Sequence, residues 1–365
     1  MNITLVISSL SSGGAERVLV LLAEGFQRNG HRVTVVTLYG TDLDFYKVPD
    51  GVQRLALNVA GNSSTLVQAI WNKVYRLWVL RRAIQSTQPD IVISFIDQIN
   101  VITSLALTNT GYPIIATEHC DPSTISYGFI WERLRRITYP NIDRIVSVSK
   151  GVDRYFDWLP KAQRAVIHNP LAPLVLSPKK HPATGRSLIA MGRLTQQKGF
   201  DILLQAFARL KDIYQEWTLT ILGEGELRTE LESLCDSLGL CDRVHLPGVV
   251  QTPYEVLLQA DIFVMSSRFE GFGNVLIEAM ACGLPVISTD CPSGPNEIIR
   301  DGVDGILVPN KDVDALAEAM DRLMSDEDER KRLSSCAMEA VERFSLEKIM
   351  GMWEKLLAQV VEERV

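Results

Sequence analysis

The opening segment ITLVISSLSSGGAERVLVLLAEGFQRN, residues 3–29, contains the local pattern that decides the fold. Ile3–Ile7 is a short apolar run, which is typical of a strand buried on both faces of a sheet. A turn over residues 8–14 follows, and apolar side chains then recur at helical spacing from Val18 to Phe26. A strand, a glycine-containing turn and an amphipathic helix in this order predict the first half of a βαβ unit.

The same alternation of apolar runs and amphipathic stretches continues along all 365 residues. In the first half it predicts further strands over Val33–Thr37, Ile91–Phe95, Ile114–Thr117 and Ile145–Val148. In the second half it predicts helices over Phe200–Leu210 and Leu227–Leu238, and strands over Leu188–Met191, Thr218–Leu222, Val244–Leu246, Ile262–Met265 and Val286–Ile287. We therefore expect an α/β fold of two Rossmann-like, doubly wound domains. Two such domains facing each other form a cleft at the carboxyl ends of their strands, where ligands bind.

A proline-rich stretch without clear periodicity separates the two halves. It begins with HNPLAP, residues 168–173, and continues through Pro178, Lys179, Lys180 and Pro182. We predict a first domain over residues 1–170 and a second over residues 171–345. The final segment, residues 346–365, contains one more helical stretch, with Ser345 as its N-cap.

The composition is that of an ordinary globular protein, with 46% hydrophobic and 22% charged residues and a mean hydropathy of +0.08. It excludes a disordered, collagen-like or coiled-coil chain. The N-terminus shows no signal peptide, and the longest uncharged stretch, residues 98–117, contains Asn, Gly and Pro residues that fit a membrane span poorly. Six cysteines without C-x-x-C spacing favour free thiols, so we expect a cytoplasmic protein without a zinc site.

The net charge of −7 is unevenly distributed. Residues 1–170 contain 17 Lys and Arg against 13 Asp and Glu, a net charge of +4, whereas residues 171–365 contain 20 against 31, a net charge of −11. The split suggests that the first half faces an anionic partner, although chance drift between two domains would give the same result. A net charge of only +4 and the lack of a recognisable motif argue against nucleic acid as that partner.

Residues 71–82, WNKVYRLWVLRR, are both aromatic and cationic. On a helical wheel Lys73, Arg76 and Arg81 fall within an arc of roughly 140°. A basic, Trp-bearing helix can lie in an anionic membrane interface or bind a lipid diphosphate, so these three cations are candidates for acceptor or membrane contact. The alternative is an ordinary domain helix whose long cationic stems cover apolar surface.

The segment Glu270-Gly271-Phe272-Gly273-Asn274-Val275-Leu276-Ile277-Glu278 is the strongest sign of chemistry in the chain. It joins a predicted strand to a helix, and its glycines let backbone amides approach a ligand at the helix start, which favours anions. Eight helical steps span about 12 Å, the scale of a nucleotide sugar from ribose to hexose. Each carboxylate can accept hydroxyl hydrogen bonds, although two glutamates at this spacing are also common on solvated helices.

Arg193 and Lys198 follow another predicted strand, between Gly192 and Gly199. Two cations in one loop can stabilise the negative charge that develops on a leaving diphosphate, Arg as a bidentate donor and Lys as a point charge. Taken alone, such a pair is more often a solvated surface feature. Beside the paired glutamates we assign it to the leaving group, and a metal ion is then unnecessary.

Two further candidates lie in the first half. Gly13-Gly14 opens the first helix, where backbone amides can cradle a phosphate or a sugar, although a glycine pair also makes a simple tight turn. The pattern is not G-x-G-x-x-G, which disfavours a dinucleotide dehydrogenase. His119 follows a strand end, where cleft residues lie, although a lone histidine is more often structural.

Taken in order, these segments resemble those of the retaining glycosyltransferases with the GT-B fold. Residues 268–287 resemble the paired-glutamate signature of that family, residues 192–199 are similar to its diphosphate-binding segment, and residues 12–17 resemble its N-terminal glycine loop. The resemblance implies sugar transfer from a nucleotide-diphosphate donor with retention of configuration. It also implies an N-terminal acceptor-binding domain, a C-terminal donor-binding domain and a last helix that crosses back to the first domain.

The same resemblance implies roles for individual residues. His119 would contact the donor sugar near its reacting carbon, Glu270 the sugar hydroxyls and Glu278 the ribose, with backbone amides at residues 272–274 on the diphosphate or sugar and no covalent nucleophile. Residues 13–17 and 293–299 most resemble bacterial α-hexosyl or N-acetylhexosaminyl transferases that elongate polyprenyl-diphosphate-linked glycans, and UDP is the preferred donor nucleotide. We therefore expect a cytoplasmic protein, peripheral at the inner face of the plasma membrane.

Other interpretations remain open. Asp42-Leu43-Asp44 fits the D-x-D pattern that holds a divalent metal in another glycosyltransferase fold, but we expect it, like Asp326-Glu327-Asp328, to be a solvated acidic turn, and we expect no metal or cofactor requirement. A non-hydrolysing sugar-nucleotide epimerase or a non-catalytic nucleotide-sugar-binding module would carry similar segments. The two cations and the two glutamates together argue against both.

Overall fold

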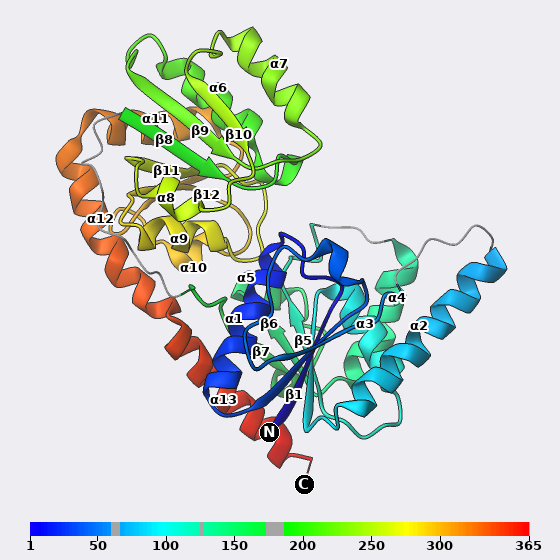
Figure 1. The fold of residues 1–365 in the computed structure, drawn as a ribbon. Helices are drawn as coiled ribbons and strands as arrows, with labels where there is room; N and C mark the ends of the chain where they lie inside the picture. The colour runs from blue at the N-terminus through cyan, green and yellow to red at the C-terminus, as the bar shows by residue number, and fades with distance from the viewer. Residues whose placement is uncertain (60–65, 125–127, 173–185, 365) are drawn as a thin grey trace. The chain divides into compact units, whose positions relative to one another are not determined.

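The computed structural model describes residues 1–59, 66–124, 128–172 and 186–364. The chain divides into two compact units (Figure 1). Unit 1 comprises Met1–Ala172 together with Leu346–Val365, and unit 2 comprises Pro173–Ser345. The predicted linker residues Pro178, Lys179, Lys180 and Pro182 lie outside the described residues.

Unit 1 contains a sheet with helices on both faces. Its strands are β1 (Asn2–Ile7), β2 (Arg32–Thr37), β3 (Gln53–Ala56), β4 (Ile91–Phe95), β5 (Ile114–Glu118), β6 (Arg144–Ser147) and β7 (Arg164–Val166). Its helices are α1 (Gly14–Arg28), α2 (Leu66–Ser86), α3 (Asp97–Ala106), α4 (Phe129–Thr138), α5 (Lys150–Arg154) and α13 (Leu346–Glu362). Its short 3₁₀ turns are η1 (Thr41–Leu43), η2 (Tyr139–Asn141) and η3 (Lys161–Gln163).

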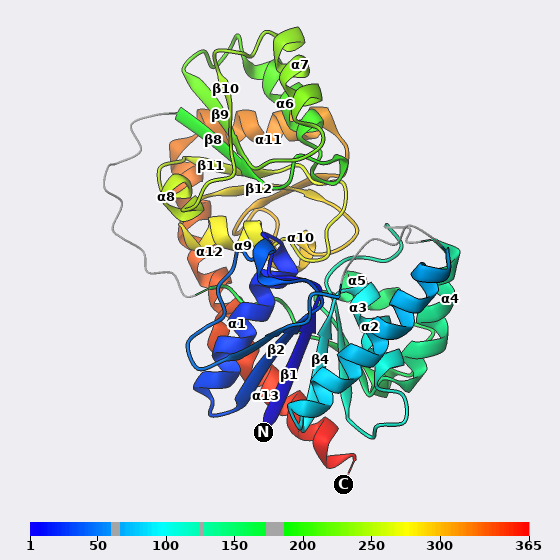
Figure 2. The same ribbon diagram turned by 45° about the vertical axis from the view of Figure 1, so that its right-hand side comes forward.

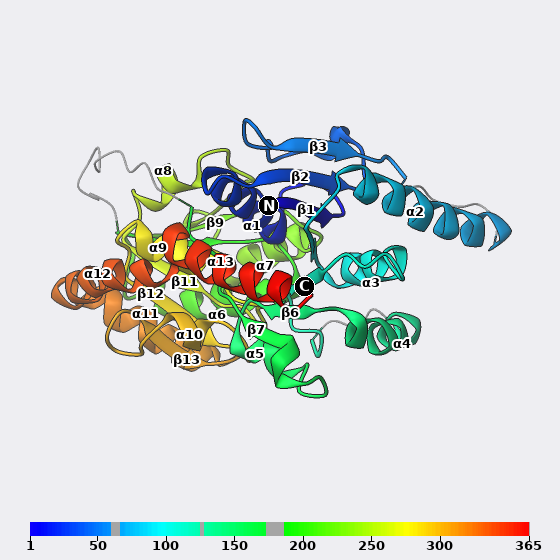
Figure 3. The same cartoon turned by 90° about the horizontal axis from the view of Figure 1, so that it is seen from below.

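The described strands of unit 1 form a seven-stranded parallel sheet in the order β3-β2-β1-β4-β5-β6-β7. The apolar runs Ile3–Ile7 and Ile91–Phe95 are buried throughout, because helices cover both sides of a parallel sheet. Figures 2 and 3 show α2, α3 and α4 along one face and α1 and α13 along the other. The predicted α/β class and Rossmann-like architecture are confirmed for this half.

The C-terminal helix α13 belongs to unit 1, where its apolar face packs on α1 and the sheet. Gly25 lies in this contact, and a Cβ atom there would come within 2.5 Å of the Met350 sulfur. A larger residue at position 25 would therefore push the two helices apart. Trp353 meets the Phe26 ring edge to face, with ring centroids 6.1 Å apart. These contacts join the two ends of the chain in one core.

Unit 2 is built on the same scheme. Its strands are β8 (Arg186–Met191), β9 (Trp217–Leu222), β10 (Val244–Gly248), β11 (Ile262–Met265), β12 (Val286–Asp290) and β13 (Ile306–Pro309). Its helices are α6 (Phe200–Leu210), α7 (Arg228–Leu238), α8 (Pro253–Leu257), α9 (Asn274–Ala281), α10 (Pro295–Ile298), α11 (Val313–Ser325) and α12 (Glu327–Val341). Its 3₁₀ turns are η4 (Gln196–Lys198) and η5 (Glu342–Phe344).

The described strands of unit 2 form a six-stranded parallel sheet in the order β10-β9-β8-β11-β12-β13. Helices α6, α7 and α11 pack together around a core that includes Phe207, Trp217 and Leu323, and α9 packs against α8 and α12. In both sheets the strand order reverses beside the first strand of the unit, between β1 and β4 and between β8 and β11. Ligands of such sheets bind at this switch point, outside the carboxyl ends of the strands.

Differences between the predicted and observed elements lie at the sheet edges and at the boundary between the halves. The sequence pattern does not predict β3, β7 or β13, which are short edge strands. β3 and β7 are partly exposed and lack a continuous apolar run, whereas β13 does contain a short one at residues 306–308 that the pattern misses. Residues 168–172 are part of unit 1, where Asn169 and Leu171 are buried. The start of the predicted linker stretch, His168 to Ala172, therefore belongs to unit 1.

Candidate active site

Two loops of unit 2 meet at the switch point of its sheet. The loop after β8 carries Arg193 and Lys198, and the loop after the neighbouring strand β11 carries Glu270. Because adjacent parallel strands end at the same edge, Lys198 Nζ lies 2.5 Å from Glu270 Oε1 although the two residues are 72 positions apart. Their side chains are only 15% and 7% exposed, so this is a largely buried ion pair.

Hydrogen bonds hold these two loops against each other. The Arg268 N–H donates to the Gln197 carbonyl at 2.7 Å, and Gln197 Nε2 donates to the Phe269 carbonyl at 3.0 Å. Ser266 Oγ donates to the Lys198 carbonyl at 3.0 Å. The loops therefore form one pre-organised surface, and the buried ion pair is held by the backbone around it.

Two glycines allow close approach between loops of unit 2: Gly199 between the loops after β8 and β11, and Gly294 between the loops after β12 and β11. Gly199 has a φ of +62°, and a Cβ atom there would lie 2.2 Å from the Ser266 carbonyl oxygen. Gly294 has a φ of +98°, and a Cβ atom there would lie 2.0 Å from the Phe272 carbonyl oxygen. Any side chain at either position would force the loops apart, in addition to straining the backbone.

The Glu270 carboxylate is bound on one side. Ser267 Oγ donates to Oε1 at 2.6 Å, the same oxygen that Lys198 contacts. Thr289 Oγ1 donates to the Ser267 carbonyl at 2.6 Å, which fixes the serine. Within the described parts of the chain, Oε2 of Glu270 receives no hydrogen bond, so this oxygen can accept one from a ligand hydroxyl.

Arg193 lies at the end of β8, and its side chain is exposed. Over the described ranges its guanidinium forms no ion pair with an acidic side chain. Lys198 in the same loop lies against Gly192, where a Cβ atom would come within 3.0 Å of the lysine stem. The loop thus presents one guanidinium to solvent beside one largely buried ammonium.

The start of α9 lies in the second loop. Residues 272–274 lead into the helix through Gly273, which has a φ of +107°, and the first turn contains no acidic residue. A helix start of this kind favours an anion, because its N–H groups and the helix dipole point toward it. Glu278 lies one turn further along α9 and is 4% exposed. The structure therefore brings Lys198 and Glu270 into contact and places Glu278 on the helix that follows them.

His119 of unit 1 follows β5 and stacks on Phe95, with ring centroids 5.5 Å apart. Thr117 Oγ1 donates its proton to the Ser94 carbonyl at 2.9 Å, so it can only accept from His119 Nε2 at 3.1 Å. The ring proton therefore lies on Nε2, and Nδ1 is an acceptor. Nδ1 is buried and has no hydrogen-bond partner among the residues described. Burial lowers the pKa of His119 to about 4, which keeps the ring neutral at neutral pH.

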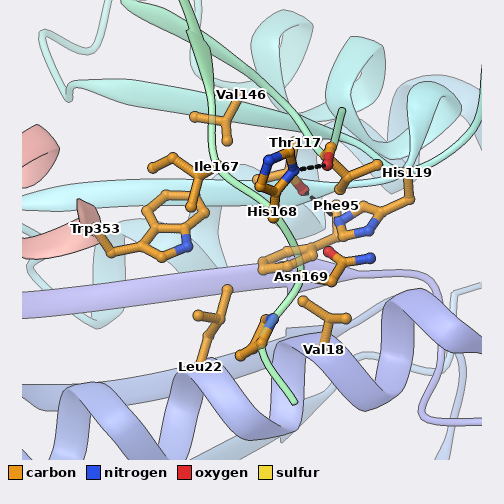
Figure 4. Close-up of a pocket in the computed structure, with 12 residues that line it drawn as sticks. Val18, Leu22, Phe95, Thr117, His119, Val146, Ile167, His168, Asn169 and Trp353 are labelled. Carbon is orange, nitrogen blue, oxygen red and sulfur yellow. Dashed lines mark hydrogen bonds between the residues drawn. The ribbon is translucent and has the colours of Figure 1, made fainter. Parts of the chain in front are cut away.

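A small pocket within unit 1 lies beside this histidine (Figure 4). Its lining is mostly apolar and comes from α1, α13 and the carboxyl ends of several strands. Figure 4 shows His119 and Trp353 at opposite ends of the pocket, with Asn169 next to His119. The sequence pattern does not identify Asn169 as a pocket residue. Its one local signal is a polar amide side chain between His168 and Pro170, near the end of the predicted first domain.

A buried polar network, also not predicted, lies at the end of β5. Tyr139 Oη donates to Glu118 Oε1, and Asn100 Nδ2 donates to the same oxygen at 2.9 Å and to the Thr117 carbonyl at 3.0 Å. Burial, with a smaller contribution from the nearby Asp97 charge, raises the pKa of Glu118 to about 8. Glu118 is therefore mainly protonated at neutral pH.

Arg135 extends this network from β5 to α4. It is 2% exposed and binds Asp97 at the start of α3 through two hydrogen bonds, while its Nη1 donates to Tyr155 Oη at 2.9 Å. Burial raises the pKa of Asp97, although Arg135 opposes this shift. The network ties α3, α4 and η2 to the strand end that precedes His119. Its signal in the sequence is a set of polar residues inside otherwise apolar runs.

The glycine turn after β1 is shaped by an acidic side chain. A Cβ atom at Gly13 would lie 2.0 Å from Glu16 Oε2, and Ser11 Oγ donates to Glu16 Oε1 at 3.3 Å. The carboxylate lies at the start of α1, where it interacts favourably with the helix dipole. A neutral hydroxyl therefore fits beside Gly13-Gly14 better than a second anion does.

The three cations predicted for acceptor or membrane contact lie on α2 in different environments. Lys73 is exposed and Arg76 is half-buried. Arg81 Nη1 donates to the carbonyls of Ala106 and Thr108, at 3.2 and 3.0 Å, where α3 ends. Arg81 therefore holds α2 against α3, as basic side chains often do at a helix C-terminus.

The acidic pair Asp42 and Asp44 is exposed, and Asp44 forms an ion pair of 2.6 Å with Arg54. No group of three or more His, Cys, Asp or Glu side chains in the described ranges could hold a metal ion. In the same ranges, none of the helices combines the length and apolar character needed to cross a bilayer.

Two Rossmann-like units, each with polar side chains at its switch point, define a two-domain α/β protein of the kind that binds ligands at strand ends. The family model described as Glycosyltransferase Family 4 matches residues 12–173, and the model described as Glycosyl transferases group 1 matches residues 177–339. The chain belongs to the glycosyltransferases of the GT-B fold.

Individual relatives agree with this assignment. A Campylobacter jejuni GalNAc-alpha-(1->4)-GalNAc-alpha-(1->3)-diNAcBac-PP-undecaprenol alpha-1,4-N-acetyl-D-galactosaminyltransferase is 29% identical over 361 residues, which are 99% of each chain. The fold is similar to a glycosyltransferase from Rickettsia africae, with a TM-score of 0.82, 20% identity and 98% of each chain covered. It is also similar to Anabaena Alr3699/HepE in complex with UDP, with a TM-score of 0.80, 19% identity, and 98% of this chain and 100% of that chain covered.

Proposed function

We propose that this protein transfers a hexose or an N-acetylhexosamine from a nucleotide-diphosphate sugar, preferably a UDP-sugar, to a polyprenyl-diphosphate-linked glycan. The observation that carries the proposal is the Lys198–Glu270 pair at the switch point of unit 2. The acceptor class is supported by the name of the Campylobacter jejuni relative, which acts on an undecaprenyl-diphosphate glycan. The nucleotide is supported by the UDP complex of the similarly folded Anabaena protein.

In this proposal unit 2 binds the donor. Breaking the bond between sugar and diphosphate develops negative charge on the leaving group. Arg193 and Lys198 stabilise that charge in the transition state, together with the N–H groups at the start of α9. With two cations and a helix start available, the transfer proceeds without a divalent metal.

The two glutamates bind hydroxyl groups. Glu270 Oε1 is held by Lys198 and Ser267, so Oε2 accepts a hydrogen bond from a hydroxyl of the donor sugar. Glu278 binds the ribose diol. Neither residue acts as a nucleophile: the configuration is retained because the acceptor hydroxyl attacks the face of the sugar from which the diphosphate departs.

Unit 1 in this proposal binds the acceptor and contributes His119 to the donor sugar. The neutral ring presents its unprotonated Nδ1, which accepts a hydrogen bond from a sugar hydroxyl. The amides of Gly13-Gly14 bind sugar and not phosphate, because the Glu16 carboxylate already lies at this helix start. The reaction takes place at the inner face of the plasma membrane, where lipid-linked acceptors are extended.

A panel of nucleotide sugars, incubated with the protein and a polyprenyl-diphosphate glycan, tests the proposal. We expect transfer to the lipid-linked acceptor with a UDP-sugar and an α linkage by NMR, at a rate that EDTA does not change. Conversion of the donor to its epimer without an acceptor would instead indicate a sugar-nucleotide epimerase. Donor binding without either product would indicate a non-catalytic binding module.

A further inference from the structure

The outward face of α2 is apolar and aromatic. Trp71, Val74, Tyr75 and Trp78 are 70%, 56%, 49% and 55% exposed. Their i, i+3, i+4, i+7 spacing places them in one stripe, the pattern that a helix normally turns toward a core. Here the core-facing positions are filled by other residues, such as the buried Leu80, so the stripe faces solvent.

Cations accompany this stripe. Arg82 continues it by one turn, with its guanidinium carbon 5.8 Å from the centre of the Trp78 ring. Residues 71–86 contain Lys73, Arg76, Arg81 and Arg82 and no acidic residue. An aromatic stripe with a purely cationic complement is typical of a helix that lies in a membrane interface.

Helix α4 presents a second exposed apolar surface, although this helix also carries Glu132, which pairs with Arg136 at 3.3 Å. Phe129, Ile130 and Ile137 are 78%, 72% and 57% exposed, and Arg133 and Arg136 between them are exposed as well. Helix α3 packs between α2 and α4 on one face of the sheet (Figures 1 and 3). The two exposed stripes therefore flank α3 on the same side of unit 1.

The two stripes begin at the same edge of the sheet as the candidate site of unit 1. Helices of a βαβ unit run antiparallel to the strands, so the N-terminal ends of α2 and α4 lie toward the carboxyl edge of the sheet. Trp71 and Phe129 lie at those ends, and His119 lies at the same edge of the sheet, at the end of β5.

We propose that the outward faces of α2 and α4 dock unit 1 on an anionic lipid bilayer. Trp71, Trp78 and Phe129 insert among the lipid head groups, and Arg82 and Arg133 lie against lipid phosphates. This surface goes beyond the proposed transfer reaction, and its existence does not depend on the donor or the acceptor. It differs from the arc of cations that the sequence indicates, because Arg81 is bound to the end of α3.

A bilayer fits this surface better than a second copy of the chain. In a two-fold symmetric dimer the same patch meets itself, so the cations of α2 would face the cations of the partner. Residues 71–86 of α2 contain no acidic residue that would compensate them, and Glu132 of α4 is already paired with Arg135 and Arg136. An anionic membrane supplies the opposite charge over the whole patch and receives the aromatic side chains without desolvating unpaired cations.

Co-sedimentation with phosphatidylglycerol–phosphatidylcholine vesicles tests this docking surface in the full-length protein. We expect the wild type to bind these vesicles, to bind phosphatidylcholine alone much more weakly, and to be released by salt. Trp71→Ala with Trp78→Ala, and separately Phe129→Ala with Ile130→Ala, should each weaken vesicle binding by at least about tenfold. Arg82→Gln with Arg133→Gln should remove most of the preference for phosphatidylglycerol.

Ile213→Ala is the matched control, because Ile213 is 67% exposed but lies in unit 2. Its vesicle binding should equal that of the wild type, and all variants should keep the wild-type melting temperature because the replaced side chains are exposed. Equal vesicle binding by the wild type and the Trp variants would overturn the proposal. So would a change of sedimentation coefficient in those variants without lipid, which would assign the surface to a second copy. The vesicles contain neither donor nor acceptor, so loss of sugar transfer and loss of docking are separate results.

Discussion

Lys198→Ala is the most informative perturbation of the candidate site, because it affects stability and catalysis by separable amounts. Lys198 Nζ contacts Glu270 Oε1 at 2.5 Å, and the two side chains are 15% and 7% exposed. Removing the ammonium leaves a largely buried carboxylate whose remaining donor, among the residues that the structure describes, is Ser267 Oγ. Breaking such a pair from one side lowers the free energy of unfolding by about 3 kcal/mol.

The catalytic loss should be of similar size but of different origin. If Lys198 stabilises the leaving diphosphate, its removal lowers kcat by about 10²–10³, the usual cost of one electrostatic donor in a transition state. In the double variant Lys198→Ala/Glu270→Gln the buried carboxylate is neutral, so most of the lost stability should return. The rate should not return, because the charge for the leaving group is still missing.

Initial rates at saturating donor measure kcat, and urea unfolding measures the free energy of unfolding. Both are measured on the same protein preparations. Lys331→Ala is the matched control, since Lys331 pairs with Glu327 at 2.8 Å but both side chains are about two-thirds exposed, 69% and 67%. It should leave rate and stability unchanged, as exposed pairs usually contribute little. A Lys198→Ala protein that is destabilised but keeps kcat within about threefold of the wild type would refute the catalytic role and leave Lys198 as the counter-ion of Glu270.

Three further predictions concern the remaining site residues. Glu278→Gln should raise the Kd for the UDP-sugar roughly tenfold to a hundredfold by calorimetry, because a charged hydrogen bond to the ribose is lost, with little change in turnover at saturating donor; an unchanged Kd would remove the ribose assignment. His119→Ala should lower kcat/KM about tenfold or more for the natural donor but not for a donor that lacks the contacted hydroxyl, and an equal loss with both donors would show that the histidine acts otherwise. Glu118→Gln should flatten the pH dependence of stability. The pKa of Glu118 in the native state, about 8, lies above the ordinary 4.5, so between these values the native state binds more protons than the unfolded state. The wild type therefore loses stability as the pH rises from about 4.5 to 8. Urea unfolding across this range, with the 74% exposed Glu339→Gln as control, checks this, and identical pH profiles of wild type and Glu118→Gln would contradict it.

Much of the fold follows from local patterns in the sequence. The buried central strands, such as Ile91–Phe95 and Ile262–Met265, are predicted residue for residue, since strands covered on both faces need continuous apolar runs. Helix Phe200–Leu210 is also predicted with its observed bounds. The edge strands β3 and β7 are not predicted, because they are partly exposed and keep no such run.

The sequence predicts residues of the candidate site only in loops that combine glycines with charged side chains. Residues 192–199 and 270–278 stand out because glycine permits close approach and because charged side chains next to buried strands need a partner or a ligand. Glu118 and Asn100 are not identifiable in this way. Their role depends on Tyr139 and Arg135 from other elements, and no spacing along the chain records those contacts.

The sequence by itself determined the alternation of strands and helices, the position of the two switch-point loops and the types of charge they carry, because these depend on residues that are neighbours along the chain. Only the tertiary structure decided which charges meet. The order of strands brings Lys198 into contact with Glu270, 72 residues away in the sequence. The packing of α2 binds Arg81 to the end of α3 and leaves Trp71 and Trp78 exposed to solvent. A helical wheel treats all cations of α2 alike, whereas packing buries one face and so selects which side chains remain for a partner.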